Sequence, residues 1–268
     1  MTQEELLEGQ VLVLDKPYQW TSFQAVNKVK SAIRHTFGLK KFKIGHAGTL
    51  DPLATGVLLV CVGKATKTID QLQAGEKVYT GTMVLGATTP CYDLERAIDH
   101  YYPYEHITRE AVEAVLPQFI GEIAQVPPIF SAVKIGGQRA YSYAREAKAG
   151  EEIPSPTPKN IHIAEFEITS FRPGKEASLT PIAIEDTAPD AEQNHHLYDH
   201  PLGSVPEHLP QLDFRIRCGK GTYIRSIARD LGLALDSGAF LSSLRREQVG
   251  EYTIENAITL DKVESLIC

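Results

Sequence analysis

One run of fourteen residues organises this chain: Gly45-His46-Ala47-Gly48-Thr49-Leu50-Asp51-Pro52-Leu53-Ala54-Thr55-Gly56-Val57-Leu58. Its three glycines allow the backbone to approach a ligand closely or to take positive φ angles. Asp51 ends a long acid-free stretch, so its carboxylate either caps a helix or takes part in chemistry. Pro52 fits a helix that begins after an Asp51 N-cap, and capping aspartates greatly outnumber reactive ones. Both interpretations stay open from this run alone.

Length and composition predict a soluble, self-sufficient fold. The chain has 268 residues, and 43% of them are hydrophobic, which is enough for a substantial core. Its four cysteines form no C-x-x-C pair, so neither a disulfide framework nor a zinc knuckle is indicated, and a reducing cytoplasm is expected. No apolar run approaches membrane-spanning length, and the N-terminus has no signal-peptide pattern, so we expect neither secretion nor membrane insertion.

The charge is distributed unevenly. The formal net charge is −7, which at face value argues against a nucleic-acid partner. Residues 16–50, however, contain seven lysines and arginines and no acid, whereas residues 176–213 contain eight acids and no lysine or arginine. Because an electrostatic footprint is local, the net charge does not exclude a basic surface for nucleic acid.

Apolar periodicity predicts alternating strands and helices. Strands are predicted at 11–14, 57–62, 78–85, 161–171 and 212–218. Thr21 and Gln24 form a capping box for a helix whose apolar positions are Phe23, Val26, Val29 and Ile33. A second helix begins at Thr108 and is shortened by Pro117.

A third helix, with Thr222 as its cap, carries an apolar stripe from Ile224 to Leu235. Its first turn holds Tyr223 and Arg225, off that stripe. Because the helix macrodipole disfavours arginine at an N-terminus, we expect a nearby anion, for which Asp51 is a candidate.

Two long segments lack such periodicity. Residues 126–158 are rich in proline and glycine with basic and aromatic side chains, which is typical either of a loop that closes over a ligand or of a plain surface loop. Residues 176–213 form an acidic excursion. Four histidines crowd there, His195, His196, His200 and His208, but they have no metal-ligand spacing, so no metal site is predicted.

Six motifs occur in an order that resembles one family, the TruB-type tRNA pseudouridine synthases. They are Leu14-Asp15-Lys16-Pro17, the Asp51 run from Gly45 to Gly56, Lys77-Val78-Tyr79 with Leu85-Gly86, Gln125-Val126-Pro127-Pro128 with Ser131-Ala132, Gly219-Lys220-Gly221-Thr222-Tyr223-Ile224-Arg225, and Leu244-Arg245-Arg246. The resemblance implies an α+β pseudouridine synthase fold. In that fold a large mixed, mostly antiparallel sheet is flanked by helices, and the active cleft lies across the sheet.

The resemblance also implies an activity. A member of this family isomerises the T-loop uridine at position 55 of tRNA to pseudouridine without cofactor or metal, by detaching the base, rotating it and rejoining it through C5. By similarity, Asp51 is the nucleophile, Tyr79 stacks on the target base, and Arg225 pairs with the nucleophile. The same similarity gives four substrate-binding residues: Tyr223 and Leu244 in the pocket, His46, which inserts into the T loop, and Lys16, which is structural or contacts RNA.

These implied roles agree with the chemistry of the side chains. A base in a folded loop must be flipped out before it can react, and an aromatic face returns part of that cost by stacking. An arginine beside the carboxylate favours its ionised form. Recognition is expected to depend on loop shape, with the basic stretch contacting phosphates and residues 126–158 acting as a thumb on the T arm.

The chain departs from the family pattern in places. We expect a single catalytic domain over residues 1–268, a monomer, with no C-terminal RNA-binding domain of the PUA type. Gln19-Trp20-Thr21-Ser22 stands where relatives often have a glycine and paired serines. Two alternative functions remain: a non-catalytic RNA-binding or RNA-chaperone module in which Asp51 only caps a helix, and a glycosidic hydrolase, which usually needs a second carboxylate.

Overall fold

A computed structural model describes residues 1–131, 133–136, 138–139, 155–175, 203 and 205–267. The helices are α1 (Gln3–Gly9), α2 (Ser22–Phe37), α3 (Ile69–Ala74), α4 (Arg109–Val115), α6 (Ile224–Ala234) and α7 (Val263–Ile267). The longer strands are β1 (Gln10–Lys16), β2 (Ile44–Ala47), β3 (Thr55–Val62), β4 (Lys77–Leu85), β7 (Gly121–Gln125), β10 (Lys159–Arg172), β11 (Gln211–Cys218) and β12 (Ala239–Val249). The two-residue strands are β5 (Ala87–Thr88), β6 (His100–Tyr101), β8 (Lys134–Ile135), β9 (Gln138–Arg139), β13 (Tyr252–Thr253) and β14 (Ile258–Thr259).

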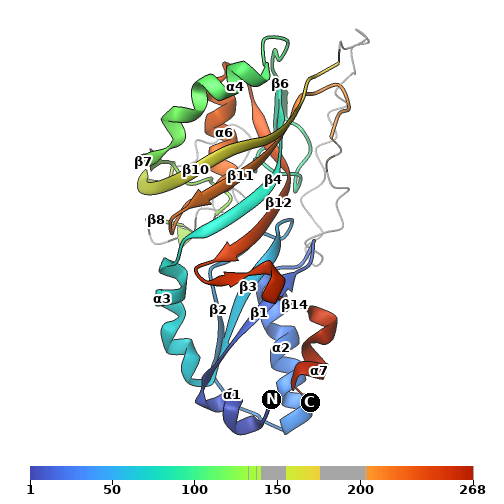
Figure 1. Ribbon diagram of the computed structural model, residues 1–268, viewed down its shortest axis with the longest axis vertical. Coiled ribbons are helices and arrows are strands. Elements are labelled where there is room, and N and C mark those ends of the chain that lie inside the picture. Colours follow the sequence, from blue (N-terminus) through green and yellow to red (C-terminus); the bar gives the residue numbers. More distant parts are fainter. Residues whose placement is uncertain (132, 137, 140–154, 176–202, 204, 268) are drawn as a thin grey trace.

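A ten-stranded sheet runs along the length of the molecule (Figure 1). Its order is β14-β1-β3-β12-β4-β11-β10-β7, with β13 beside β12 and β2 beside β3. Neighbouring strands are antiparallel except for β1 with β14 and β3 with β12, which are parallel. The predicted α+β class, with a mixed and mostly antiparallel sheet, is therefore confirmed.

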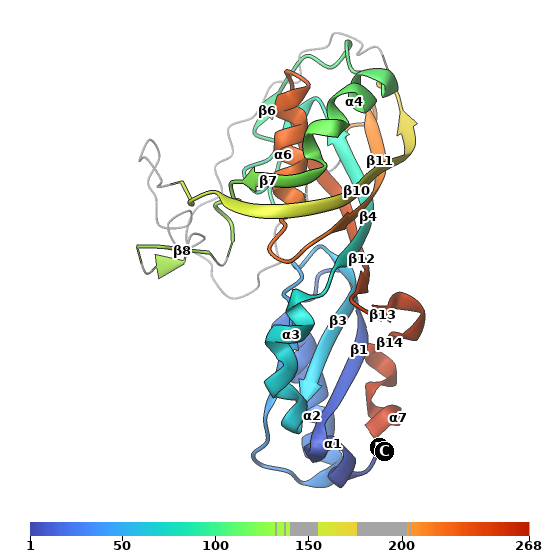
Figure 2. The ribbon, with the colours of Figure 1, turned by 60° about the vertical axis from the view of Figure 1, so that its left-hand side comes forward.

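The sheet is divided between two halves of the molecule. Figure 2 shows α1, α2, α3 and α7 around β1 and β3 in one half, and α4 and α6 against β4, β10 and β11 in the other. Both termini lie in the first half, where the Met1 amino group donates to the Leu266 carbonyl oxygen at 3.1 Å. One buried apolar cluster includes residues from both halves, so hydrophobic burial stabilises them together.

The halves meet where β3 runs parallel to β12. Thr55 pairs with Arg245 and Gly56 with Arg246, at the end of the Asp51 motif. Gly56 has a φ of 99°, and a Cβ atom there would lie 2.2 Å from the Arg246 carbonyl oxygen. This close approach of two backbones at a positive φ requires glycine.

Most predicted elements are confirmed, because their periodicity was strong. The Thr21 capping box begins α2, and the helix from Thr108 ends in a 3-10 turn that contains Pro117, as expected. The apolar stripe predicted on α2 is wrong at Phe23, whose side chain is 70% exposed. Thr222 is not the cap of α6: Tyr223 occupies that position without a side-chain hydrogen bond to the helix.

The acidic excursion ends earlier than predicted. Residues 211–213 already belong to β11, where Asp213 forms an ion pair with Arg172 and accepts a hydrogen bond from Thr82 at 2.7 Å. The rest of that segment lies largely outside the described residues, as do His195, His196 and His200. Residues 126–158 are described only in part, and those parts include the β8–β9 hairpin.

Gln19 lies in the stretch after Lys-Pro that departs from the family pattern. Its φ is 64°, in the left-handed region that favours glycine. A non-glycine residue there carries a backbone cost. The loop therefore keeps the backbone shape that a glycine would adopt without strain.

We expect Gly56→Ala to lower the free energy of unfolding by about 3 kcal/mol or more, because the methyl group collides with backbone at a positive φ. Gly38→Ala is the matched control, since Gly38 has a φ of 64° with nothing within 4 Å of the added Cβ. That control is expected to lose only about 1 kcal/mol. Urea unfolding measures both values, and equal losses would contradict the proposed clash.

Candidate active site

Asp51 lies in the turn between β2 and β3, where the predicted helix does not form. The residues after it make a turn in which the Ala54 amide donates to the Asp51 carbonyl oxygen at 3.1 Å, and β3 follows at Thr55. The helix-cap interpretation is therefore wrong. The Asp51 side chain remains 38% exposed, so the carboxylate is free to meet a ligand.

Buried side chains hold the backbone on the N-terminal side of Asp51. The Ser22 hydroxyl donates to the Leu50 carbonyl oxygen at 3.0 Å and accepts from the Leu50 amide at 2.9 Å. Arg246 is 1% exposed, and its Nη2 donates to the Gly48 carbonyl oxygen at 3.0 Å, while its Nε donates to that of Val57 at 2.7 Å. The bonds at Gly48 and Leu50 give backbone groups of the turn hydrogen-bond partners, and the bond at Val57 ties Arg246 to β3.

Lys16 holds the other side of the turn. It is fully buried, and its Nζ donates to the carbonyl oxygens of Pro17 at 2.9 Å, Trp20 at 2.6 Å and Pro52 at 3.1 Å. Burial lowers the pKa of Lys16 to about 8, against the opposing effect of the Asp51 charge. Of its two expected roles the structural one fits, because a fully buried ammonium does not reach RNA.

Arg225 pairs with Asp51, as expected from its place in the first turn of α6. Its Nε donates to Asp51 Oδ2 at 2.8 Å. Nη1 donates to the Cys91 carbonyl oxygen at 3.1 Å and Nη2 to that of Phe130 at 2.9 Å. The Arg225 side chain is only 6% exposed, so its predicted place off the buried stripe is wrong. The guanidinium is fixed on three sides and holds the carboxylate in one orientation.

Asp93 is a second carboxylate at this guanidinium, and the sequence patterns did not predict it. Its Oδ2 lies 3.6 Å from Arg225 Nε, and its side chain is 8% exposed. Burial raises the pKa of Asp93, and burial together with Asp93 and Asp51 raises the pKa of Glu95 to about 7. Burial alone would lower the pKa of Arg225, but these carboxylates outweigh it and raise that pKa. No local motif marks this segment, since its role arises only from folding against Arg225.

A cavity of about 310 Å³ lies beside Asp51. Tyr79, Tyr223, Leu244 and Arg225 line it with Asp51, so five of the seven predicted site residues meet there. They come from the Asp51 turn, β4, β12 and the start of α6. The predicted cleft across the sheet thus corresponds to a space lined by both halves of the molecule.

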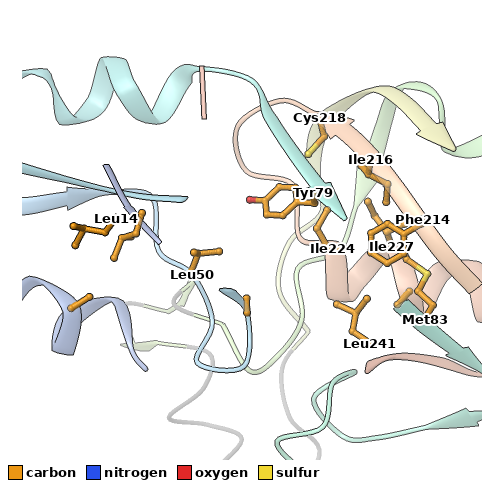
Figure 3. Packing of buried hydrophobic residues seen from close by; sticks show 14 of the residues in the cluster. Leu14, Leu50, Tyr79, Met83, Phe214, Ile216, Cys218, Ile224, Ile227 and Leu241 are labelled. Atoms are coloured by element: carbon orange, nitrogen blue, oxygen red, sulfur yellow. The ribbon is translucent and has the colours of Figure 1, made fainter. Parts of the chain in front are cut away.

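Tyr79 lines this cavity while its ring also packs in the core. Figure 3 shows the ring between the group around Phe214 and the group around Leu50. The side chain is 9% exposed, and burial raises the pKa of its hydroxyl, which keeps the phenol neutral. One face of an aromatic ring held in this way can receive a planar ligand.

His46 stands apart from this group. It lies on β2 opposite Val60, half-buried, and does not line the cavity. Burial, followed by the charge of Arg246, lowers the pKa of His46, so the imidazole is neutral at pH 7. Its Nδ1 atom is buried without a hydrogen-bond partner in the described part of the chain.

Within the described ranges, no three His, Cys, Asp or Glu side chains are grouped so that they could hold a metal ion. His208, the described member of the histidine-rich stretch, instead packs its ring near those of Tyr101 and Tyr104. No helix in the described residues is both long enough and apolar enough to cross a membrane.

Two family models match the sequence. One, described as TruB family pseudouridylate synthase (N terminal domain), matches residues 34–187. The other, described as tRNA pseudouridylate synthase B C-terminal domain, matches residues 225–268. In the structure this second range includes most of α6 and the central strand β12, so it is continuous with the rest of the fold.

Curated relatives resemble the chain over nearly its whole length. A protein named tRNA pseudouridine synthase B from Flavobacterium johnsoniae is 49% identical over 265 residues, which cover 98% of each chain. A protein of the same name from Phocaeicola vulgatus is 44% identical over 254 residues, 95% of this chain and 91% of the relative.

A solved structure shows the same fold. A chain in the crystal structure of a Cbf5-Nop10-Gar1 complex aligns with a TM-score of 0.61 and 25% identity, over 99% of this chain and 56% of that chain. This protein therefore spans about half the length of that relative. The matches over nearly the full length of the curated relatives, together with the family models, show that the chain belongs to the TruB family of pseudouridylate synthases.

Proposed function

We propose that this protein isomerises uridine to pseudouridine in tRNA, and that its target is the T-loop uridine at position 55. The ion pair of 2.8 Å between Asp51 and Arg225, at the wall of a cavity that Tyr79 also lines, carries this proposal. The relatives named tRNA pseudouridine synthase B supply the substrate class. We further propose that the enzyme binds the T arm as a monomer.

The proposed chemistry begins with a flipped uridine in the cavity. Asp51 acts as the nucleophile, and the hydrogen bond from Arg225 Nε orients its carboxylate. The carboxylate forms a transient covalent bond with the nucleotide, which breaks again before the product leaves. The bond from N1 of the base to C1′ of the ribose breaks, the base rotates, and C5 bonds to C1′. The proton lost from C5 is balanced by one gained at N1, so the reaction needs no other reactant. The Tyr79 ring stacks on the base throughout.

The two alternatives have little support. A module in which Asp51 only caps a helix is contradicted by the turn that follows this residue. A glycosidic hydrolase needs two carboxylates flanking the scissile bond, but Asp93 is 8% exposed and faces the same guanidinium as Asp51. Incubation with unmodified tRNA transcript, followed by chemical mapping of pseudouridine, tests the proposed activity directly.

We expect Asp51→Asn to abolish pseudouridine formation while leaving tRNA affinity unchanged, because the amide keeps the shape but is not a nucleophile. Single-turnover assays and filter binding measure the two effects. Asp213→Asn is the control, since it removes an Asp–Arg ion pair with Arg172 that does not line the cavity. Full activity of the Asp51→Asn variant would contradict the proposed role of Asp51 as the nucleophile.

The stacking role of Tyr79 is tested by two substitutions that both retain an apolar side chain. We expect Tyr79→Leu to lower kcat/KM by roughly 10- to 100-fold, because base stacking on an aromatic face is lost. Tyr79→Phe keeps that face and is expected to lose much less. Urea unfolding shows whether the fold is affected. A loss of activity that only matches the loss of stability would mean that Tyr79 serves the core and has no stacking role.

The basic loop after α2 is proposed to contact RNA phosphates. Lys16 is buried and Lys28 pairs with Glu264 at 2.7 Å, but Lys40, Lys41 and Lys43 are exposed. We expect replacement of these three lysines by glutamate to weaken tRNA binding and to flatten the slope of log K against log salt by about 2 or more.

Lys262→Glu serves as the control for this triple variant, because it reverses an exposed charge outside the basic loop. Its affinity and salt dependence are expected to match those of the unaltered protein. An unchanged tRNA affinity of the triple variant would contradict the proposal that this loop contacts RNA.

A further inference from the structure

The cavity beside Asp51 continues along β4 to a second group of side chains. Lys77 and Tyr79 are two residues apart on this strand and both line the cavity, as expected for positions that share one face. Gln73 and the turn from Gly219 to Thr222, which includes Lys220, complete this part of the lining. Apart from Tyr79, none of these residues has a role in the proposed chemistry.

Lys77 is a buried cation without a carboxylate partner in the described residues. It is 6% exposed, and its Nζ donates to the carbonyl oxygens of Gln73 and Gly75. Burial, followed by repulsion from Arg246, lowers the pKa of Lys77 to about 8. A buried ammonium is costly unless hydrogen bonds or an anion compensate it, and one of its three N–H groups remains for such a partner.

Lys220 adds a second positive charge at the same place. It is exposed in the turn before α6, and its charge also acts to lower the pKa of Lys77, so the two ammonium groups repel each other. The neighbouring carboxylate of Glu76 is engaged by Arg217 at 3.2 Å. In the described part of the chain, no carboxylate forms an ion pair with Lys77 or Lys220.

Among the described residues that line the cavity, the one carboxylate is that of Asp51, and Arg225 already pairs with it. The Lys77 end therefore carries an uncompensated positive charge in a lining that is open to a ligand. Two neighbouring cations repel each other, and this repulsion destabilises the protein when no anion is bound. An anion that arrives with the substrate would remove this cost.

We propose that Lys77 and Lys220 form a phosphate subsite that holds the phosphodiester flanking the target uridine. This inference rests on the proposed function, because it needs the base to lie on Tyr79 beside Asp51. Two residues along a strand span about 7 Å, so the subsite lies within one nucleotide of the stacked base. Lysine binds phosphate as a point charge, so the contact positions the nucleotide without reading its sequence.

Lys220→Gln tests the subsite without disturbing the core, because this side chain is exposed. We expect the variant to bind an RNA T-arm stem-loop roughly tenfold more weakly, with the slope of log K against log salt reduced by about 1. Lys262→Gln is the matched control, an exposed lysine outside the cavity, and its affinity and slope are expected to be unchanged.

Stem-loops in which single phosphates are replaced by neutral methylphosphonates locate the contact. At one position next to the target uridine, the neutral linkage is expected to weaken RNA binding to the unaltered protein roughly tenfold. The Lys220→Gln variant is expected to bind this neutral stem-loop as tightly as it binds the unaltered stem-loop, because the contact is already lost. Additive losses at every position, or an unchanged salt slope, would overturn the subsite. Lys77→Met is expected to repeat the result if it folds, and the Lys220 cycle decides the question if it does not.

The two levels of the proposal fail in different ways. The subsite is judged by equilibrium binding, and the proposed function is judged by pseudouridine formed on the unmodified stem-loop or tRNA. Binding that shows the non-additive cycle without any pseudouridine would keep the subsite and remove the isomerase. Pseudouridine formation together with additive losses of binding affinity would keep the isomerase and remove the subsite.

Discussion

Two buried cations, Arg246 and Lys16, hold the loop that carries Asp51, and the rest of the site depends on them. Each donates to a backbone carbonyl oxygen of this loop, Arg246 to that of Gly48 and Lys16 to that of Pro52, and Arg246 also donates to the Val57 carbonyl oxygen in β3. Buried charges are costly in isolation, but here they satisfy carbonyl groups that no neighbouring strand of the described chain reaches. The loop is thereby fixed before a ligand arrives, and its carboxylate needs little reorganisation.

The backbone of Arg246 joins the two halves of the sheet. Arg246 pairs with Gly56 of β3 and with Tyr79 of β4, so one residue of β12 touches the end of the motif and the strand that carries the aromatic ring. The absence of a side chain at Gly56 lets these backbones meet. A site assembled at this junction takes residues from both halves, which explains why Asp51 and Tyr79, the proposed nucleophile and the proposed stacking ring, come from different elements of the fold.

Electrostatics at the site differ from those of the whole chain. The net charge of −7 owes much to the acids between residues 176 and 213, whereas the cavity is bordered by four cations, Lys77, Lys220, Arg225 and Arg246. Asp51 and Asp93 balance the charge of Arg225, and loop carbonyls occupy Arg246. What remains is positive and suits a polyanion, so an acidic protein can present a locally basic cavity.

Local patterns in the sequence were enough to predict the main elements and the family. Apolar β-prone runs located β3 and β4, period-two alternation located β11, and helical spacing located α6, while the motif around Asp51 identified the pseudouridine synthases. The pairing of Arg225 with Asp51 was also predictable, since the helix macrodipole disfavours an arginine in the first turn unless an anion lies nearby.

Other features became visible only in the folded chain. Asp51 sits in a turn, Lys16 is buried beneath it, and Asp93 and Lys77 join the site. These placements depend on contacts between residues far apart in the chain, and local periodicity carries no information about such contacts.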